Sequence, residues 1–278
     1  GAPLAYRRIA CGTEATNPSN GWADDAAAEK FAEIAGKTTN DTTPVMAVAP
    51  GPLELLPNQF YPRPWLHVRI IRSSGPIGPR ATAFDFLHLP SKDKPNPYDL
   101  YRDTRSWYRL INPSLADPAQ LYRFQPGEVF KIIGEAIDAA ESFHRELGDY
   151  YHPTTFAYFG RDKAHLAYGQ IRWVAQETTG GGALLTPANV RAAQFIEHSP
   201  EGARTVDVDK RHRFTFVPEP QDAPGDDTVP HQSGAGPSGK VRQIFTTSGY
   251  RHQESYQDKS MVLLTRYCIV KIVQGLTQ

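Results

Sequence analysis

The sequence has 278 residues with 30 basic and 30 acidic side chains, so its formal net charge is zero. With 40% hydrophobic and 22% charged residues it is typical of a globular protein, and its charge offers no long-range attraction to nucleic acid. The two cysteines, Cys11 and Cys268, are too few for a disulfide framework, and no run of 18 apolar residues predicts a transmembrane helix.

The first part of the sequence predicts a helix, a short strand and two stretches in which prolines alternate with large apolar residues. Residues 22–37 are rich in Ala, Glu and Lys and predict a helix. Residues 50–66 and 84–117 are interrupted by prolines, which predicts irregular segments that bury their aromatic side chains. A short strand is predicted between them at Leu66–Arg72. The two stretches suit a lid over a lipid site, and a cap that only covers the core is the alternative.

The clearest helix is predicted at Gly127–Tyr151. Its apolar residues from Val129 to Leu147 recur at helical spacing along one stripe, and Gly148 is a plausible stop. Strands are predicted at Thr155–Gly160 and 169–177, where aromatic and β-branched residues lie between turn residues.

The last third of the sequence predicts four further elements. Pro187 begins a short helix that we expect to extend over residues 187–197. Alternating Val and Phe over residues 202–220 predict a half-exposed hairpin. A strand is predicted at Val241–Gly249, and residues 260–275 predict a mostly buried closing helix.

The candidate site lies in two loops on either side of the 241–249 strand. Asp226 and Asp227 stand in the loop "GDDTVP" before it, and His252 stands in "GYRHQESY" after it. In an open α/β sheet functional groups gather at the carboxyl ends of strands. A carboxylate that orients a histidine is two thirds of a hydrolase triad, and the acid-then-histidine order is that of α/β-hydrolases. The alternatives are a surface histidine and a pair of turn aspartates.

These motifs resemble the closing segment of serine lipases and acyltransferases of the lecithin:cholesterol-acyltransferase and GPI-inositol-deacylase type. The chain resembles more closely the bacterial α/β-hydrolase phospholipases that are delivered as type VI secretion effectors, including the stretches "APGPLELLPNQFYPRPWL" and "HPTTFAYFGRDKAHLAYGQIRW". The resemblance implies that Asp226 is the triad acid and His252 the base. Asp227 takes a place often held by Gly in this motif, which leaves Asp226 or Asp227 as the acid.

The nucleophile that the resemblance implies is a serine in G-x-S-x-G, and this sequence contains no such motif. The strained turn around that serine needs small residues two positions before and after it. Ser73 and Ser74 have Ile71 and Arg72 two residues before them, and Ser199 follows a predicted helix. We therefore expect the serine to lie in a hydrolase segment that precedes this sequence, which begins "GAPLAYRR".

The expected fold is the C-terminal part of an α/β-hydrolase with a helical, loop-rich cap or lid. Residues 1–50 would follow the absent nucleophile strand, residues 51–150 would form the cap, and residues 151–278 would carry the acid and the histidine. The expected function is a serine lipase or phospholipase that cleaves acyl esters of membrane lipids. The alternative is a non-catalytic module that a partner or immunity protein binds.

We expect no cofactor, no metal and no nucleic-acid partner. The segment "GAGPSGK" at 234–240 resembles a phosphate loop, but a strand-like segment follows it and Val241 replaces the metal-binding Ser or Thr. "KRHR" at 210–213 predicts a solvated hairpin face, and the spacing of His144, Asp149 and His152 matches no metal motif. The sequence shows no signal peptide, and secretion into a target-cell periplasm is implied only by the resemblance.

Overall fold

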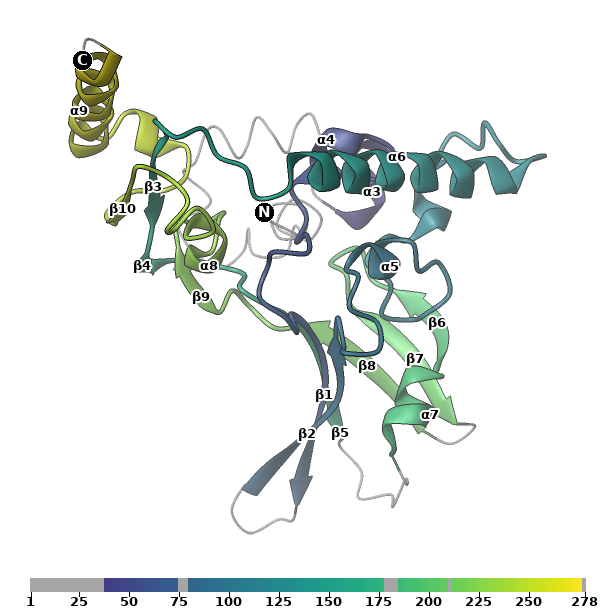
Figure 1. The fold of residues 1–278 in the computed structure, drawn as a ribbon. Coiled ribbons are helices and arrows are strands. Elements are labelled where there is room, and N and C mark those ends of the chain that lie inside the picture. The colour runs from purple at the N-terminus through teal and green to yellow at the C-terminus, as the bar shows by residue number, and fades with distance from the viewer. Residues whose placement is uncertain (1–37, 75–79, 178–184, 210–211, 277–278) are drawn as a thin grey trace.

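The computed structural model describes residues 38–74, 80–177, 185–209 and 212–276. The predicted helix at 22–37 and Cys11 lie outside these residues. The described chain contains a six-stranded mixed sheet with helices packed near it, and a smaller region with two short two-stranded sheets (Figure 1). The chain therefore has a mixed α/β fold, as the sequence predicts.

The six-stranded sheet has the strand order β2-β1-β5-β8-β7-β6. Its strands are β1 (Leu66–Ser74), β2 (Arg80–Leu89), β5 (Ile171–Glu177), β6 (Gln194–His198), β7 (Arg204–Asp209) and β8 (His212–Pro218). β1 pairs parallel with β5, and the other neighbours are antiparallel. Leu66, Val68 and Ile70 alternate along β1 and are fully buried, so one face of the sheet lies against the core.

Helices and turns of the first half of the chain lie over this sheet (Figure 1). They are α3 (Thr39–Met46), α4 (Pro50–Glu54), α5 (Tyr98–Tyr101), the 3₁₀ turn η3 (Pro113–Leu115) and α6 (Pro126–Leu147). α6 confirms the predicted long helix, and it ends at Gly148, whose φ of 57° lies in the left-handed region. Its buried stripe consists of Ile133, Ala136, Ile137 and Ala140, which turns the helix toward α4 and the core.

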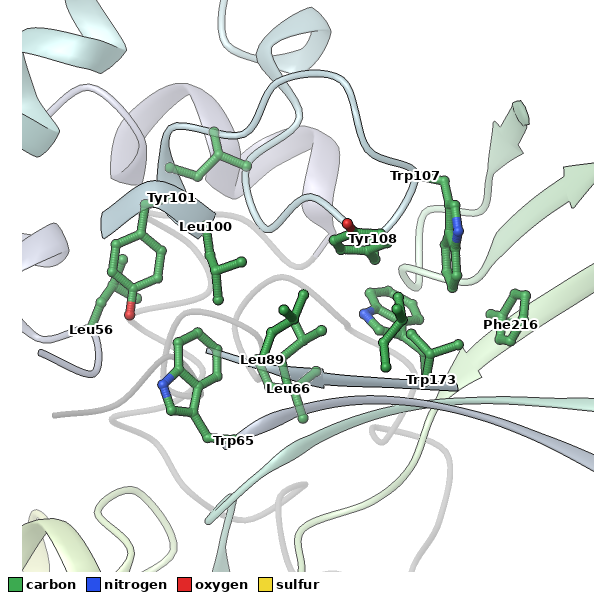
Figure 2. Close-up of a cluster of buried hydrophobic side chains, with 14 of the residues drawn as sticks. Leu56, Trp65, Leu66, Leu89, Leu100, Tyr101, Trp107, Tyr108, Trp173 and Phe216 are labelled. Atoms are coloured by element: carbon green, nitrogen blue, oxygen red, sulfur yellow. The ribbon is translucent and has the colours of Figure 1, made fainter. Parts of the chain in front are cut away.

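Aromatic side chains pack with leucines in the core between the sheet and these helices (Figure 2). The ring of Trp107 stacks on Phe216 with centroids 4.4 Å apart and meets Trp173 edge-on at 6.3 Å. Trp65 stacks on Tyr101 at 6.1 Å. The proline-rich stretches therefore bury most of their aromatic residues, as predicted, whereas Phe60 and Phe84 are exposed.

Two expectations about the sheet are wrong. Residues 84–117 were expected to be irregular, but their first part belongs to the ten-residue strand β2, because its apolar Leu87 and Leu89 pair with β1 and are buried. The helix predicted at 187–197 ends earlier, as α7 (Pro187–Arg191), and β6 follows it. Pairing with β7 overrides the helix preference there, since Phe195 finds a strand partner in Val206.

The smaller region contains the two strands predicted at 155–160 and 241–249. β3 (Phe156–Gly160) and β10 (Gln243–Thr247) form a parallel pair. An unpredicted strand, β4 (Asp162–Ala167), pairs antiparallel with the short β9 (Ala223–Gly225). α8 (His231–Gly234), the turn η4 (Glu254–Tyr256) and α9 (Lys259–Leu276) complete the region.

The closing helix α9 exists as predicted, but the expectation that it is mostly buried is wrong. Met261 is buried, whereas these large side chains are 44–63% exposed: Leu263, Tyr267, Ile269, Val270 and Val273. The helix contacts β10 through the edge-on ring pair of Phe245 and Tyr267, and it lies at the periphery of the molecule (Figure 1). None of the helices in the described part of the chain is long and apolar enough to cross a membrane.

Candidate active site

The parallel pair of β3 and β10 positions two loops side by side. In its register Gly160, the last residue of β3, lies opposite Thr247, the last residue of β10. A Cβ atom on Gly160 would lie 2.8 Å from the Cβ of Asp226, so this glycine allows the acidic loop to approach the end of β3. His252 follows the end of β10. Both predicted site residues thus lie at the carboxyl ends of neighbouring parallel strands, where α/β folds place functional groups.

Asp226 and His252 contact each other through both side chain and backbone. The Nδ1 of His252 lies 2.9 Å from Oδ2 of Asp226, and the backbone N–H of His252 donates to the carbonyl of Asp226 at 2.8 Å. The second carboxylate oxygen, Oδ1, accepts the N–H groups of Thr228 at 3.2 Å and Val229 at 2.7 Å. The two backbone donors on Oδ1 therefore fix the orientation of the carboxylate and leave Oδ2 for the ring of His252.

The surroundings of His252 stabilise the protonated form of its ring. The hydrogen bond to Asp226 raises the pKa of His252, and partial burial opposes it. The side chain of Asp226 is 11% exposed and that of His252 is 43% exposed. With Nδ1 bonded to the carboxylate, Nε2 is the ring nitrogen that can accept a proton from another group.

The structure separates the two candidate acids. Asp227 forms an ion pair with Arg251, whose Nε lies 3.3 Å from its Oδ2, whereas the carboxylate that bonds to Nδ1 of His252 is that of Asp226. Its φ of 71° lies in the left-handed region, which glycine adopts without strain and which aspartate tolerates. This backbone conformation explains why a glycine suits this position, and it leaves Asp226 as the partner of His252.

Replacing Asp227 with glycine is expected to change the free energy of unfolding by less than about 1 kcal/mol, because relief of the left-handed strain offsets the loss of a partly buried ion pair. Asp227→Val is expected to destabilise the protein by more than about 1 kcal/mol, since β-branched residues resist positive φ. Urea denaturation of both variants measures the difference. Equal stability of the two variants would contradict the left-handed conformation at this position.

Asp162 is a site residue that the sequence analysis missed. It stands two positions after Gly160, and its Oδ2 accepts the backbone N–H of Gly249 at 2.8 Å, while Oδ1 accepts that of Ala164 at 2.8 Å. These two hydrogen bonds hold the pKa of Asp162 below its usual range. Gly249 has a φ of 88° and begins the loop of His252. The signal that could have identified Asp162 is an acid directly after the predicted strand at 155–160.

The buried side chain of Tyr250 also holds the loop of His252 in place. Its hydroxyl donates a hydrogen bond to Oγ1 of Thr247, which in turn donates to the carbonyl of Phe159 at 2.8 Å. Tyr250 is buried, and burial raises its pKa, so the phenol stays neutral. The loop of His252 is therefore tied to β10 and β3 on one side and to Asp162 on the other.

Ser255 does not bond to the ring of His252, and the three serines weighed in the sequence lie outside the loops of Asp226 and His252. Ser255 lies three residues after His252, but its buried hydroxyl donates to the carbonyl of His252 at 2.7 Å and not to the ring. Ser199 lies in the turn between β6 and β7, where its Oγ accepts the N–H of Ala203 at 3.2 Å. Ser73 and Ser74 belong to β1, in the six-stranded sheet.

Comparison with protein-family models and with curated proteins gives no match. Among solved structures, the chain is similar to one in the structure described as "The crystal structure of Tle4-Tli4 complex", with a TM-score of 0.60 and 25% sequence identity. The similarity covers 86% of this chain and 49% of the other. This chain therefore spans about half the length of the solved chain that it matches.

Proposed function

We propose that this chain supplies the acid and the base of a serine lipase or phospholipase that hydrolyses acyl esters of membrane lipids. The observation that carries the proposal is the contact of 2.9 Å between Nδ1 of His252 and Oδ2 of Asp226, at the ends of two parallel strands. The structural similarity to a protein of the Tle4-Tli4 complex supports the same kind of function, a lipase-like effector of type VI secretion.

In this proposal the nucleophile is a serine in a G-x-S-x-G segment outside the printed sequence. Nε2 of His252 takes the hydroxyl proton as the serine oxygen attacks the ester carbonyl. The ester C–O bond then breaks, and the imidazolium returns the proton to the leaving alcohol. Water attacks the acyl-enzyme in the second half of the reaction, with His252 again as base. Asp226 orients the ring and stabilises its charged form without being protonated.

The remaining assignments follow the same resemblance and are part of the proposal. The chain would be the C-terminal part of an α/β-hydrolase in which residues 51–150 belong to a cap that shields the lipid. The protein would act on membrane lipids in the periplasm of a target cell. An immunity protein would bind it, as the name of the Tle4-Tli4 complex suggests for that pair. The catalytic steps need no cofactor.

The test combines denaturing mass spectrometry of the purified protein with a fluorophosphonate probe, which labels activated serines. We expect the probe to label a second polypeptide that contains G-x-S-x-G, and p-nitrophenyl ester hydrolysis to need both polypeptides. His252→Ala is expected to abolish the hydrolysis, while Asp227→Asn leaves it unchanged.

Two results would contradict the proposal. Labelling and hydrolysis by a single species of 30.9 kDa would place the nucleophile inside this chain. If the assembled esterase keeps its activity with the His252→Ala substitution, His252 is not the catalytic base. A single species without activity that binds an immunity protein would favour the second candidate, a non-catalytic interaction module.

A further inference from the structure

A cleft of about 590 Å³ opens between α6 and the segments of α5 and η3. Its volume lies within the range of roughly 300–1,000 Å³ that is typical of small-molecule sites. The lining residues identified in the described part of the chain come from residues 101–113 and from α6, and none belongs to the loops of Asp226 and His252. The cleft is therefore separate from the candidate active site.

The floor of the cleft is apolar. Ile111, Ile133 and Ile137 line it and are at most 3% exposed as residues, so they belong to the core and form a firm surface. Phe130 stands at the edge of the cleft and is 48% exposed. A floor of branched aliphatic side chains beside a half-exposed aromatic ring suits an unbranched alkyl chain better than a polar ligand.

A glycine in the middle of α6 keeps this floor open. Gly134 lines the cleft, and a Cβ atom built on it meets no other atom within 4 Å. Glycine weakens a helix interior relative to other residues, and no close packing explains it at this position. The missing side chain leaves a recess between Phe130 and Ile137, where a ligand can approach the backbone of the helix.

The charge at the mouth of the cleft comes from one arginine. Arg102 lines the cleft but is neutralised by hydrogen bonds to Asp138 and Glu141. Arg105 also lines the cleft and is exposed, and in the described part of the chain no carboxylate lies within ion-pair distance of its guanidinium. This planar cation can bind a carboxylate through two parallel hydrogen bonds.

We propose that the cleft binds a fatty acid, with the alkyl chain over Gly134 and the isoleucine floor and the carboxylate on Arg105. The apolar floor, the recess and the uncompensated positive charge are complementary to a single-chain anionic amphiphile, and each comes from a different observation. This binding needs neither His252 nor a serine, so it does not depend on the proposed lipase activity.

Titration of the purified chain with decanoate by isothermal calorimetry tests the proposal. Gly134→Leu fills the recess and is expected to weaken decanoate binding at least tenfold without lowering the melting temperature, since leucine is the better helix former. Gly127→Leu is the matched control. Gly127 lies in the first turn of α6, a Cβ on it also meets open space, and it does not line the cleft.

The head-group contact is tested with decanol, which has the same chain length and no charge. Arg105→Gln is expected to weaken decanoate binding about tenfold and to leave decanol binding unchanged. The absence of decanoate binding to the unmodified chain would overturn the proposal. An equal loss of decanoate affinity in Gly134→Leu and Gly127→Leu would also overturn it, and so would an unchanged decanoate affinity in Arg105→Gln.

Discussion

Replacing Asp226 with asparagine is expected to lower the kcat of the assembled esterase by about four orders of magnitude, because the ring of His252 loses the acceptor that sets its tautomer. The amide can still accept the N–H of Val229, so the loop is expected to keep its conformation. The measurement is the rate of p-nitrophenyl ester hydrolysis with the serine-bearing polypeptide present. An effect below tenfold would show that Asp226 is not the triad acid.

The same substitution has a readout that needs no catalytic activity. The hydrogen bond to Asp226 is the largest cause of the raised pKa of His252, so Asp226→Asn is expected to lower this pKa. Asp227→Asn is the control and is expected to leave it unchanged. Proton NMR of the histidine ring over pH 4–9 measures both. A lower pKa in the control alone would assign the acid to Asp227.

The raised pKa of His252 determines how the stability of the fold changes with pH. The folded state binds the proton of His252 more tightly than the unfolded state, so protonation of this ring stabilises the fold. This contribution is complete below about pH 6.5, the ordinary histidine value, and is lost as the pH rises through the folded pKa. The esterase rate should instead rise over that interval, because the base must be neutral.

Replacing Trp107 with alanine is expected to lower the free energy of unfolding by about 3–5 kcal/mol. The residue is 1% exposed, its ring stacks on Phe216, and its Nε1 donates to the carbonyl of Val190 at 2.7 Å. A large cavity and an unsatisfied carbonyl would remain beneath the helices. This loss is a large fraction of the roughly 5–15 kcal/mol that stabilises a typical domain.

Trp107→Phe separates packing from hydrogen bonding in the same measurement. The phenyl ring keeps the stacking on Phe216 but cannot donate to Val190, so a loss of about 1–3 kcal/mol is expected. Urea denaturation with the slope held common gives both values. A Trp107→Ala variant that loses less than about 1 kcal/mol would contradict the buried position of this ring.

The sequence predicts elements whose pattern is local. The stripe of α6 and the alternation of β7 and β8 are visible in their own residues, and both appear in the structure. β2 and β6 are stabilised as strands by pairing with β1 and β7, which their own residues do not reveal, and the local proline and alanine content suggested loops and a helix there. The exposure of α9 was unpredictable because an all-round apolar helix normally lies inside a protein.

The candidate site also has some features that the local sequence reveals and others that depend on the tertiary fold. Asp226 and His252 could be chosen as candidates from the sequence because they stand in two loops on either side of a single strand. The choice between Asp226 and Asp227 required the backbone, since only coordinates show which carboxylate faces the ring. Asp162 was not predicted because its hydrogen-bond partner, Gly249, lies 87 residues away in the sequence. The approach of Gly160 to Asp226 is likewise a property of the tertiary fold.

The pairing of β3 with β10 has a consequence for the order of folding. The two strands are joined across some 87 residues, and most of the larger sheet folds between them. Closing so long a loop costs entropy that is recovered only when the intervening segment has become compact. We expect the contact of Asp226 with His252 to form late, after the hairpin of β7 and β8, so that a kinetic trap in the inserted segment would leave a structured protein in which the candidate site has not formed.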